Sequence, residues 1–353
     1  FYNVSIIASI YLFKGNIGIV GLGIGALAGA LLQLSIVLLG MPRLRYHWHP
    51  KILWKSADFR LILRQLPPRS MDQGIDQLES IVETHFARAL GTGFISYYNN
   101  AYIMSTAPIF LIGTAISTAA FPRLNMRLSQ GRPDLFRSDF LRILRAMIWI
   151  ALPVIIISYF TRGYLARLIY SRNSPEIALI FGFLAGSIFF GILYTIISRW
   201  FYAQKDTKTP LFVSIFAIVL DVILVSILAR SSTYGIAGLA LTQSIVSMAE
   251  VLILLGIMLI RDSRLFDRQF WGGCARILSV SGFSLMTGYV MISFLPLGVN
   301  DRGFITLGGK VFLIAAVVIL THLAISYLFG LEEVQPLFNR LKKVITKPVQ
   351  IEL

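Results

Sequence analysis

Apolar residues in this chain are grouped in blocks of about 20, and this grouping limits the fold more than any other feature. A helix needs about 20 predominantly apolar residues to cross roughly 30 Å of hydrocarbon. Windows of about 19 residues predict ten spans: 1–13, 17–40, 62–88, 95–121, 141–161, 176–202, 210–229, 234–260, 276–296 and 306–329. The blocks therefore predict an all-α fold, a polytopic membrane helical bundle.

The charged residues are few, and their positions orient the bundle. They make up 14% of the 353 residues, against roughly 25% in soluble domains, which disfavours a water-soluble enzyme. The net charge of +15 would suggest nucleic acid in a soluble chain, but here the basic residues lie in short loops between apolar blocks. That distribution indicates topology signals and contact with anionic lipids, and no nucleic-acid partner. Most of the 32 Lys and Arg lie in alternate connections, which the positive-inside rule places in the cytoplasm together with the C-terminus.

A weak internal repeat suggests how the spans are organised. GIVGL at Gly18–Leu22 opens the second span and GIAGL at Gly235–Leu239 opens the eighth. Both predicted spans run toward the cytoplasm, as expected of parallel repeats. The alternative is that glycine-rich helix starts recur by chance.

The repeat predicts two pseudo-repeat six-helix lobes, of which the first lacks four spans ahead of Phe1, followed by two C-terminal helices. The predicted parts are the last two helices of the N-lobe (1–45), a basic cytoplasmic loop (46–60), the C-lobe (61–260), a cytoplasmic linker (261–275), two additional helices (276–330) and a basic cytoplasmic tail (331–353).

The third span carries an unusual number of polar residues. Steps of three and four residues place its charged side chains on one helical stripe, formed by Arg69, Asp72, Asp76, Glu79 and Glu83. Each charge exposed to lipid would cost roughly 2.5–3.5 kcal/mol near the bilayer centre. We therefore expect the stripe to border a hydrated cavity between the lobes. The cavity-lining residues are expected to be Arg69, Asp72, Gln73, Asp76 and Gln77.

A more ordinary interpretation of the stripe stays open. Arg69 and Asp72 are three residues apart and can pair with each other, while Glu79 and Glu83 can reach the outer water. Asp221 is a second anomaly, because the run around it is otherwise apolar. An isolated carboxylate in such a run is expected to be neutral, paired with a neighbouring helix or bound to a cation.

Several segments carry a resemblance to a known family. RWFYAQKDTKTP at Arg199–Pro210, YNNAYIMSTAP at Tyr98–Pro108 and GTAISTAAFPRL at Gly113–Leu124 resemble the MurJ/MviN family of lipid II flippases, in the multidrug/oligosaccharidyl-lipid/polysaccharide exporter superfamily. The resemblance implies fourteen spans, of which this chain would hold the fifth to the fourteenth. It also implies a transporter and no enzyme, which moves the lipid-linked peptidoglycan precursor across the bacterial inner membrane by alternating access. The role would be in cell wall biogenesis and cell shape.

The same resemblance implies a sodium site and no other cofactor. Its ligands would be Glu83 on the seventh span, Asp221 on the eleventh, and Thr242 or Gln243 on the twelfth, with the Leu239 carbonyl nearby. Where the family often has an Asn one turn before the carboxylate, this chain has Ala217. In the turn at Arg199–Pro210, Trp200 and Tyr202 are expected in the interfacial aromatic belt.

One departure from the family leaves the substrate open. Family members carry an Arg on the eighth span at the position of Ile103, where it is thought to attract a pyrophosphate. Arg69 is the candidate to replace it, because a guanidinium matches phosphate oxygens bidentately. The expected partners are a polyprenyl-diphosphate-linked saccharide and membrane lipids. The alternatives are an exporter of another polyprenyl-linked oligosaccharide, a drug/cation antiporter, a non-transporting scaffold and a lipid-linked glycosyltransferase.

Overall fold

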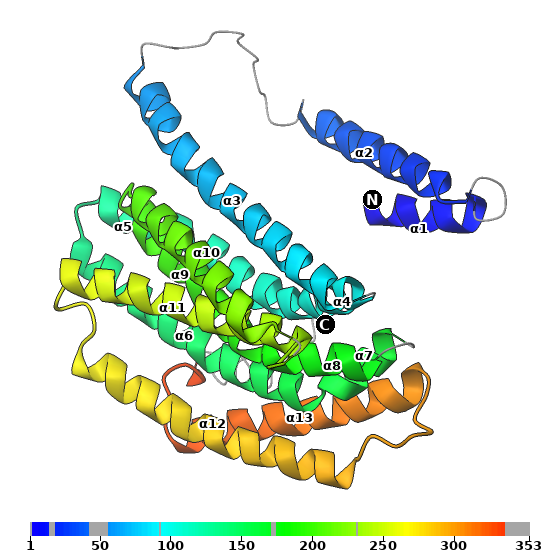
Figure 1. Cartoon of the computed structure of the whole chain (residues 1–353). Coiled ribbons are helices and arrows are strands. Elements are labelled where there is room, and N and C mark those ends of the chain that lie inside the picture. Colours follow the sequence, from blue (N-terminus) through cyan, green and yellow to red (C-terminus); the bar gives the residue numbers. More distant parts are fainter. Residues whose placement is uncertain are drawn as a thin grey trace, which may run out of the picture. The chain divides into compact units, whose positions relative to one another are not determined.

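The computed structural model describes residues 2–13, 18–41, 56–91, 93–170, 174–230 and 232–335 (Figure 1). Eleven side chains within these ranges are not described: those of Asp58, Leu61, Ile62, Arg64, Gln65, Pro68, Arg69, Asp72, Gln73, Ile75 and Asp76. Every regular element in the described part is helical, which confirms the all-α prediction. The elements are α1 (Tyr2–Phe13), α2 (Val20–Gly40), α3 (Ala57–Leu90), α4 (Phe94–Pro108), the π-helix η2 (Ile109–Thr114), α5 (Ala115–Ser129), α6 (Pro133–Phe160), α7 (Arg162–Ile169), α8 (Ser174–Phe183), α9 (Ala185–Ala203), α10 (Lys208–Leu228), α11 (Ile236–Arg261), α12 (Arg268–Phe294) and α13 (Phe304–Leu328).

Most of the predicted spans coincide with long apolar helices. In the described part of the chain, seven helical segments are long and apolar enough to cross a membrane, and the bent pair α8 and α9 makes an eighth if it is one span. Two predicted spans fall short of this standard. α1 has only 12 residues, and the 34-residue α3 carries the charged stripe. The polytopic helical bundle is confirmed, with α3 as its most polar long helix.

The chain separates into two compact units, residues 1–60 and 61–353. In the first unit, α1 and α2 pack through a row of glycines on α2 at Gly21, Gly25 and Gly29, which are buried. A Cβ at Gly29 would lie 2.9 Å from the Cα of Tyr2, and one at Gly25 would overlap the Ser9 side chain. Small residues spaced by four allow two membrane helices to approach closely, and this row does so.

The two GI-x-GL motifs have the same local structure. Gly18 and Gly235 both have a φ of +54°, a backbone conformation that residues with a Cβ rarely adopt. The second glycine of each motif donates its N–H to the carbonyl of the first, over 3.2 Å before α2 and 3.0 Å before α11. A Cβ on this second glycine would collide with the last residue of the preceding helix, α1 or α10. The motif therefore closes a tight helical hairpin in both places.

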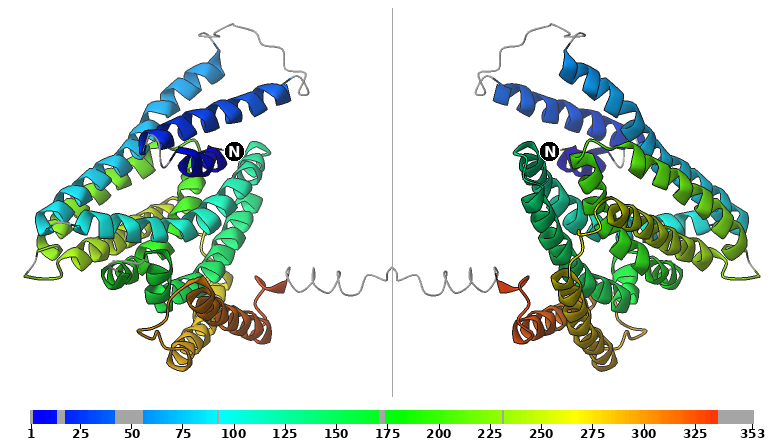
Figure 2. Two further views of the ribbon diagram at one scale, coloured as in Figure 1. Left: turned by 90° about the vertical axis from the view of Figure 1, so that its right-hand side faces the viewer. Right: turned by 90° about the vertical axis from the view of Figure 1, so that its left-hand side faces the viewer.

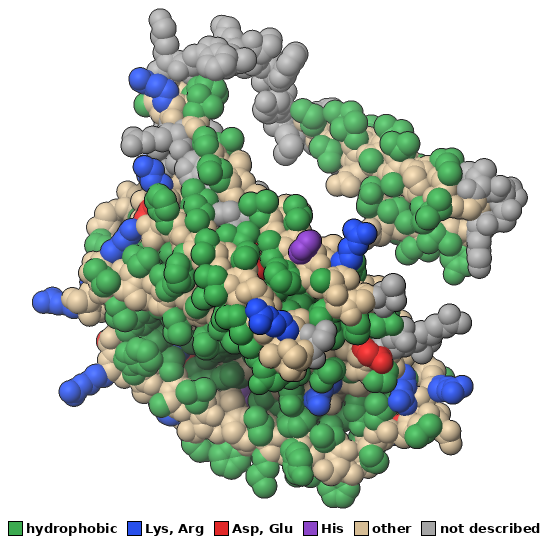
Figure 3. All heavy atoms as spheres, in the orientation of Figure 1, with side chains coloured by type: hydrophobic (Ala, Val, Ile, Leu, Met, Phe, Trp, Pro, Cys, Tyr) green, Lys and Arg blue, Asp and Glu red, His purple; other side chains and the backbone are tan. Residues whose placement is uncertain are grey.

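The second unit is built around α9. Fully buried Ile188, Ile192 and Ile196 of α9 lie in the main core, and α9 packs against α11, α6, η2 and α5. α12 and α13 pack against each other and against α6 at one side of this unit (Figure 2). Hydrophobic side chains cover much of the face shown in Figure 3, as expected for a surface in contact with lipid.

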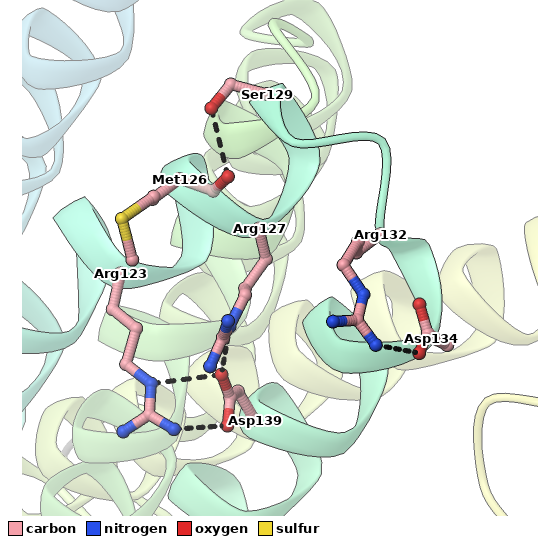
Figure 4. A network of polar contacts seen from close by, with 7 residues as sticks. All are labelled: Arg123, Met126, Arg127, Ser129, Arg132, Asp134 and Asp139. Atoms are coloured by element: carbon pink, nitrogen blue, oxygen red, sulfur yellow. Dashed lines mark hydrogen bonds and ion pairs between the residues drawn. The ribbon is translucent and has the colours of Figure 1, made fainter.

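Ion pairs join the helices near their ends. Asp139 of α6 accepts hydrogen bonds from two arginines of α5: from both Nε and Nη2 of Arg123, at 3.0 and 2.7 Å, and from Nε of Arg127, at 3.0 Å (Figure 4). Beyond α13, the chain returns to α6, where Glu333 and Glu332 pair with the buried Arg145. Leu331 and Val334 are buried beside them. The first residues of the predicted tail, 331–335, are thus packed against the bundle.

A proline in α6 is compensated by a histidine from α13. Pro153 has no N–H, so the carbonyl of Trp149 four residues earlier loses its helical hydrogen bond. Nε2 of His322 lies 3.1 Å from this carbonyl oxygen, and Nδ1 of His322 lies 2.9 Å from the Ser284 hydroxyl of α12. Because the carbonyl can only accept, the proton is assigned to Nε2. The Trp149 indole in turn donates to Ser326 at 2.9 Å. This buried network links α6, α12 and α13.

We expect His322→Leu to lower the free energy of unfolding by about 1–3 kcal/mol, because the Trp149 carbonyl and Ser284 would lose a buried partner. The measurement is the melting temperature of the purified protein in detergent. His85→Leu is the matched control, since His85 is exposed. His322→Gln should retain part of the stability, because its amide can still donate to the carbonyl. Equal melting temperatures for His322→Leu and the control would contradict this role.

Candidate functional site

Glu83 and Tyr98 form a buried pair between α3 and α4. The Tyr98 hydroxyl donates a hydrogen bond to Oε1 of Glu83, which is only 7% exposed. The ring of Tyr98 stacks on Tyr102 one turn later. Glu83 therefore lies inside the protein, and the interpretation that it reaches the outer water is wrong.

Asp221 is the single carboxylate of α10, and it lies in the interior. It is 1% exposed, and neither of its oxygens has a hydrogen-bond partner among the described residues. The buried face of α10 also holds Ser214, Ala217 and Val225, whereas Val219 and Ile223 are exposed. Asp221 is close enough to Glu83 for their charges to interact. Two carboxylates from α3 and α10 thus face one region of the interior.

α11 adds further oxygens to this region. Thr242 is fully buried, and its hydroxyl has no partner among the described residues. Oε1 of the adjacent Gln243 is also buried without a partner there. α10 and α11 are neighbours joined by a short loop, and Leu239, 1% exposed, lies one turn before Gln243. The predicted cation ligands are therefore buried on three helices, but cation binding stays a prediction.

These unpartnered atoms are informative because such atoms are rare. Most buried polar side-chain atoms in native proteins have a partner, and the exceptions call for an explanation such as a bound ion or water. Oxygen donors of this kind are the ligands that hard cations prefer. Among the described residues, no group of three His, Cys, Asp or Glu could hold a metal. The donor set present here thus fits an alkali cation better than a transition metal.

Two further polar residues of this region were not expected from the sequence. Ser214 of α10 donates a hydrogen bond of 2.9 Å to Glu250 of α11. These two residues line a small cavity together with Glu79 of α3 and Gln243. Glu250 interrupts an apolar run in the same way as Asp221, so the same argument applied to α11 would have found it.

The predicted substrate cavity is only partly described. All the predicted residues lie on α3, but the side chains of four of them, Arg69, Asp72, Gln73 and Asp76, are outside the described part of the structure. Gln77 is exposed on α3. The lining of a substrate cavity by these residues stays a prediction. Ile103, at the position of the family arginine, is 61% exposed on α4.

The turn between α9 and α10 is a compact polar structure. Asp206 accepts hydrogen bonds from the backbone N–H groups of Lys208 and Thr209, at 3.1 and 3.0 Å, and so caps α10. Arg261, at the end of α11, donates to the same carboxylate at 2.7 Å. Burial favours a raised pKa for Asp206, but the bonds from Thr209 and Arg261 outweigh it and hold this pKa below its usual range. The carboxylate thereby ties the beginning of α10 to the end of α11.

One expectation for this turn is wrong. Trp200 is 3% exposed and packs against Phe136 and Phe201 in the main core. It does not lie in an interfacial aromatic belt, because α9 is the central helix of the bundle and its last turn is still covered by α6.

Comparisons with known proteins agree on one family. The family model for the lipid II flippase MurJ matches residues 1–307. A probable lipid II flippase MurJ of Borreliella burgdorferi is 24% identical over 268 residues, which cover 74% of this chain and 52% of that protein. A probable lipid II flippase MurJ of Bdellovibrio bacteriovorus is 22% identical over 329 residues, which cover 89% of this chain and 60% of that protein.

A solved structure supports the fold. A lipid II flippase MurJ in an inward closed conformation matches with a TM-score of 0.68 and 22% identity, over 93% of this chain and 65% of that one. At this identity the likeness shows the fold alone. The chain spans 52–60% of the length of the two curated relatives.

We expect Tyr98→Phe to lower the free energy of unfolding by about 1–3 kcal/mol, because it removes the hydroxyl that donates to the buried Glu83. The measurement is thermal melting in detergent. Tyr97→Phe is the matched control, since it removes the same atom from the neighbouring residue. Glu83→Gln, alone and combined with Tyr98→Phe, completes a double-mutant cycle. Strictly additive effects in that cycle would show that the two side chains do not interact.

Proposed function

Because the chain belongs to the MurJ family of lipid II flippases, we propose that it acts in a flippase for a lipid-linked peptidoglycan precursor in the bacterial inner membrane. The observation that carries the proposal is the family match over residues 1–307. The apolar helices with polar residues buried between them are what such a transporter requires. A headgroup too polar for hydrocarbon needs a polar interior, while a polyprenyl tail remains stable in lipid.

The substrate is proposed to be a polyprenyl-diphosphate-linked saccharide. In this proposal, Arg69 attracts the diphosphate and the polar residues Asp72, Gln73, Asp76 and Gln77 keep the cavity hydrated. Arg69 is favoured because guanidinium groups bind phosphate oxygens through two parallel hydrogen bonds. The protein makes and breaks no covalent bond in this step, so no catalytic residue is assigned.

The transport cycle is proposed to be coupled to a cation, with Na⁺ as the candidate. The carboxylates of Glu83 and Asp221 and the side-chain oxygens of Thr242 and Gln243 would hold it, with the Leu239 carbonyl at the same level. Support comes from the buried side-chain oxygens of Asp221, Thr242 and Gln243, which have no partner in the part of the chain that the structure describes. Each elementary charge moved across the membrane is worth roughly 2.3 kcal/mol per 100 mV, so ion entry can drive the return of the empty transporter.

The orientation is proposed from the basic residues. The turn at Lys205 and Lys208 and the arginine-rich end of α5 and α6 would face the cytoplasm, as would the C-terminus. The bond between Asp206 and Arg261 keeps the beginning of α10 and the end of α11 at the same depth in the membrane. The two helix ends therefore belong to the same membrane face.

A second candidate is an exporter of another polyprenyl-linked oligosaccharide. Ile103 favours this candidate. An exposed isoleucine occupies the position at which family members have an arginine that is thought to attract a pyrophosphate. A different substrate headgroup would explain this replacement.

Complementation tests the first proposal. The full-length gene should restore growth to a bacterium depleted of its own lipid II flippase, and Arg69→Ala should reduce that growth strongly because the diphosphate loses its cationic partner. Glu176→Gln is the control, as Glu176 is exposed at the beginning of α8. If Arg69→Ala grows as well as the control, Arg69 does not bind the substrate. If the unchanged gene fails although its product reaches the membrane, the second candidate is favoured.

A binding measurement tests the coupling ion. Na⁺ should raise the melting temperature of the full-length protein, by an amount that corresponds to about 2.7 kcal/mol at a hundred times the dissociation constant. Asp221→Asn should abolish this rise, because the amide removes the negative charge. K⁺ at the same concentration controls for ionic strength, and Glu176→Gln controls for the loss of a carboxylate. A rise that persists in Asp221→Asn would overturn the assignment of the cation ligands.

A further inference from the structure

A polar cleft lies where the loop between α12 and α13 meets α7 and α8. Its volume is about 590 Å³, within the range of roughly 300–1,000 Å³ that is usual for small-molecule sites. Its walls include Arg167 of α7, Ser174 of α8 and, from the loop, Val299, Asp301 and Arg302. The cleft is therefore large enough for a small ligand and has mainly polar walls.

The cleft lies at the membrane face opposite the turn between α9 and α10. Arg261, at the end of α11, bonds Asp206 of that turn, and α12 begins a short linker later at Arg268. α12 is long and apolar enough to cross the membrane, and it ends at Phe294, just before the loop. In the orientation proposed above, the cleft is at the outer face.

Hydrogen bonds fix the loop that forms much of the cleft. The Tyr164 hydroxyl of α7 donates to the carbonyl of Leu295. Nη1 of Arg167, also on α7, donates to the carbonyl of Gly298 at 2.7 Å. The loop is thus tied to α7 at two points. A site whose walls are already in place loses less conformational entropy when a ligand binds.

Basic side chains are in excess around the cleft. Among the described residues that line it, Asp301 is the single carboxylate. Its Oδ2 accepts hydrogen bonds from Nζ of Lys310 at 2.6 Å and from the N–H of Gly298 at 2.7 Å. Arg167 uses one of its five N–H groups for Gly298, and Arg302 makes no hydrogen bond or ion pair with another described residue. Both guanidinium groups are therefore available to an anion.

Ser174 and the beginning of α13 add neutral donors. Ser174 is 9% exposed, and its hydroxyl makes no hydrogen bond with another described residue. Gly303, which also lines the cleft, precedes the first turn of α13, and no side chain caps this helix. The first N–H groups of a helix attract anions, and the helix dipole adds to the attraction. Guanidinium, hydroxyl and N–H donors together suit the oxygens of a phosphate.

Apolar side chains beside the cleft favour a lipid as the source of this phosphate. Val299 in its wall is 87% exposed, and Phe304 and Ile305 in the first turn of α13 are 79% and 88% exposed. A lipid with its phosphate in the cleft would cover these side chains with its acyl chains. A free phosphate would leave them in water, which costs free energy in proportion to their apolar area.

We propose that this cleft binds the phosphate headgroup of an anionic phospholipid between Arg167 and Arg302. The acyl chains of the lipid lie along α13. The headgroup bridges α7 and the loop between α12 and α13, and so holds the last two helices against the rest of the second unit. The proposal goes beyond the proposed function, because it depends on neither the transported substrate nor the coupling ion.

Native mass spectrometry of the full-length protein in detergent tests the site, with phosphatidylglycerol as the probe. The apparent Kd of the tightest phosphatidylglycerol site should rise about tenfold in Arg302→Gln, because one charge-assisted partner of the phosphate is lost. Arg302→Lys should lose less affinity, since it keeps the charge. Arg230→Gln is the matched control, because Arg230 is exposed near the end of α10, at the same face, and does not line the cleft.

Two further probes identify the source of the phosphate. Phosphatidylcholine carries the same phosphate beside a cationic group, so we expect it to bind about fivefold more weakly near the two guanidinium groups. Inorganic phosphate in excess should not displace phosphatidylglycerol, since it lacks the acyl chains.

Three results would overturn the proposal. The first is equal affinity of Arg302→Gln and Arg230→Gln for phosphatidylglycerol. The second is equal affinity of the protein for phosphatidylcholine and phosphatidylglycerol, which would show that no anionic lipid is selected. The third is displacement by inorganic phosphate, which would make the cleft a site for a free anion. Arg167→Gln should weaken binding as Arg302→Gln does. Should it fail to fold because the bond to Gly298 is lost, Arg302→Gln decides the test.

Discussion

The absence of water in the hydrocarbon core determines the rest of this structure. Any polar atom buried there must find a partner inside the protein, since none is available from the surroundings. The carbonyl freed by Pro153 is met by His322, and the guanidinium of Arg145 by two glutamates. Among the described residues, by contrast, the side-chain oxygens of Asp221, Thr242 and Gln243 are buried without a hydrogen-bond partner. The same rule that explains the scaffold thus supports the cation site proposed there.

The polar interior is organised by depth. Asp221 and Glu83 lie deep in the bundle, Glu79 and Glu250 lie nearer the end where α10 begins, and Asp206 and Arg261 close that end. Each level draws residues from more than one helix, so a shift of α3 or α10 would change the distances between the acidic groups. The affinity for the ion proposed to bind there would therefore depend on the relative position of the helices, as coupling of binding to a conformational change requires.

The sequence was sufficient to predict the helical membrane bundle and to single out Asp221 as an unusual buried carboxylate. Block length predicted the helices, because crossing hydrocarbon requires a fixed number of apolar residues. Asp221 could be singled out as an isolated carboxylate in an apolar run, because the free energy lost on removing its charge from water must be compensated by a partner. The pairing of Glu83 with Tyr98 could not be predicted, since their helices meet only in the folded bundle. The prediction that Trp200 lies in the interfacial aromatic belt failed for a related reason, because the composition of a helix does not reveal whether that helix is central in the bundle. Glu250 was overlooked, although its pattern matches that of Asp221.

The contact at Pro153 bears on how the bundle can move. Prolines in membrane helices commonly act as swivels, since the backbone there lacks a bond that would resist bending. In α6 the carbonyl that lacks this bond is met instead by an imidazole from a helix more than 160 residues later. α6, α12 and α13 are consequently tied to one another at this point, and bending of α6 at Pro153 would have to break the bond to His322.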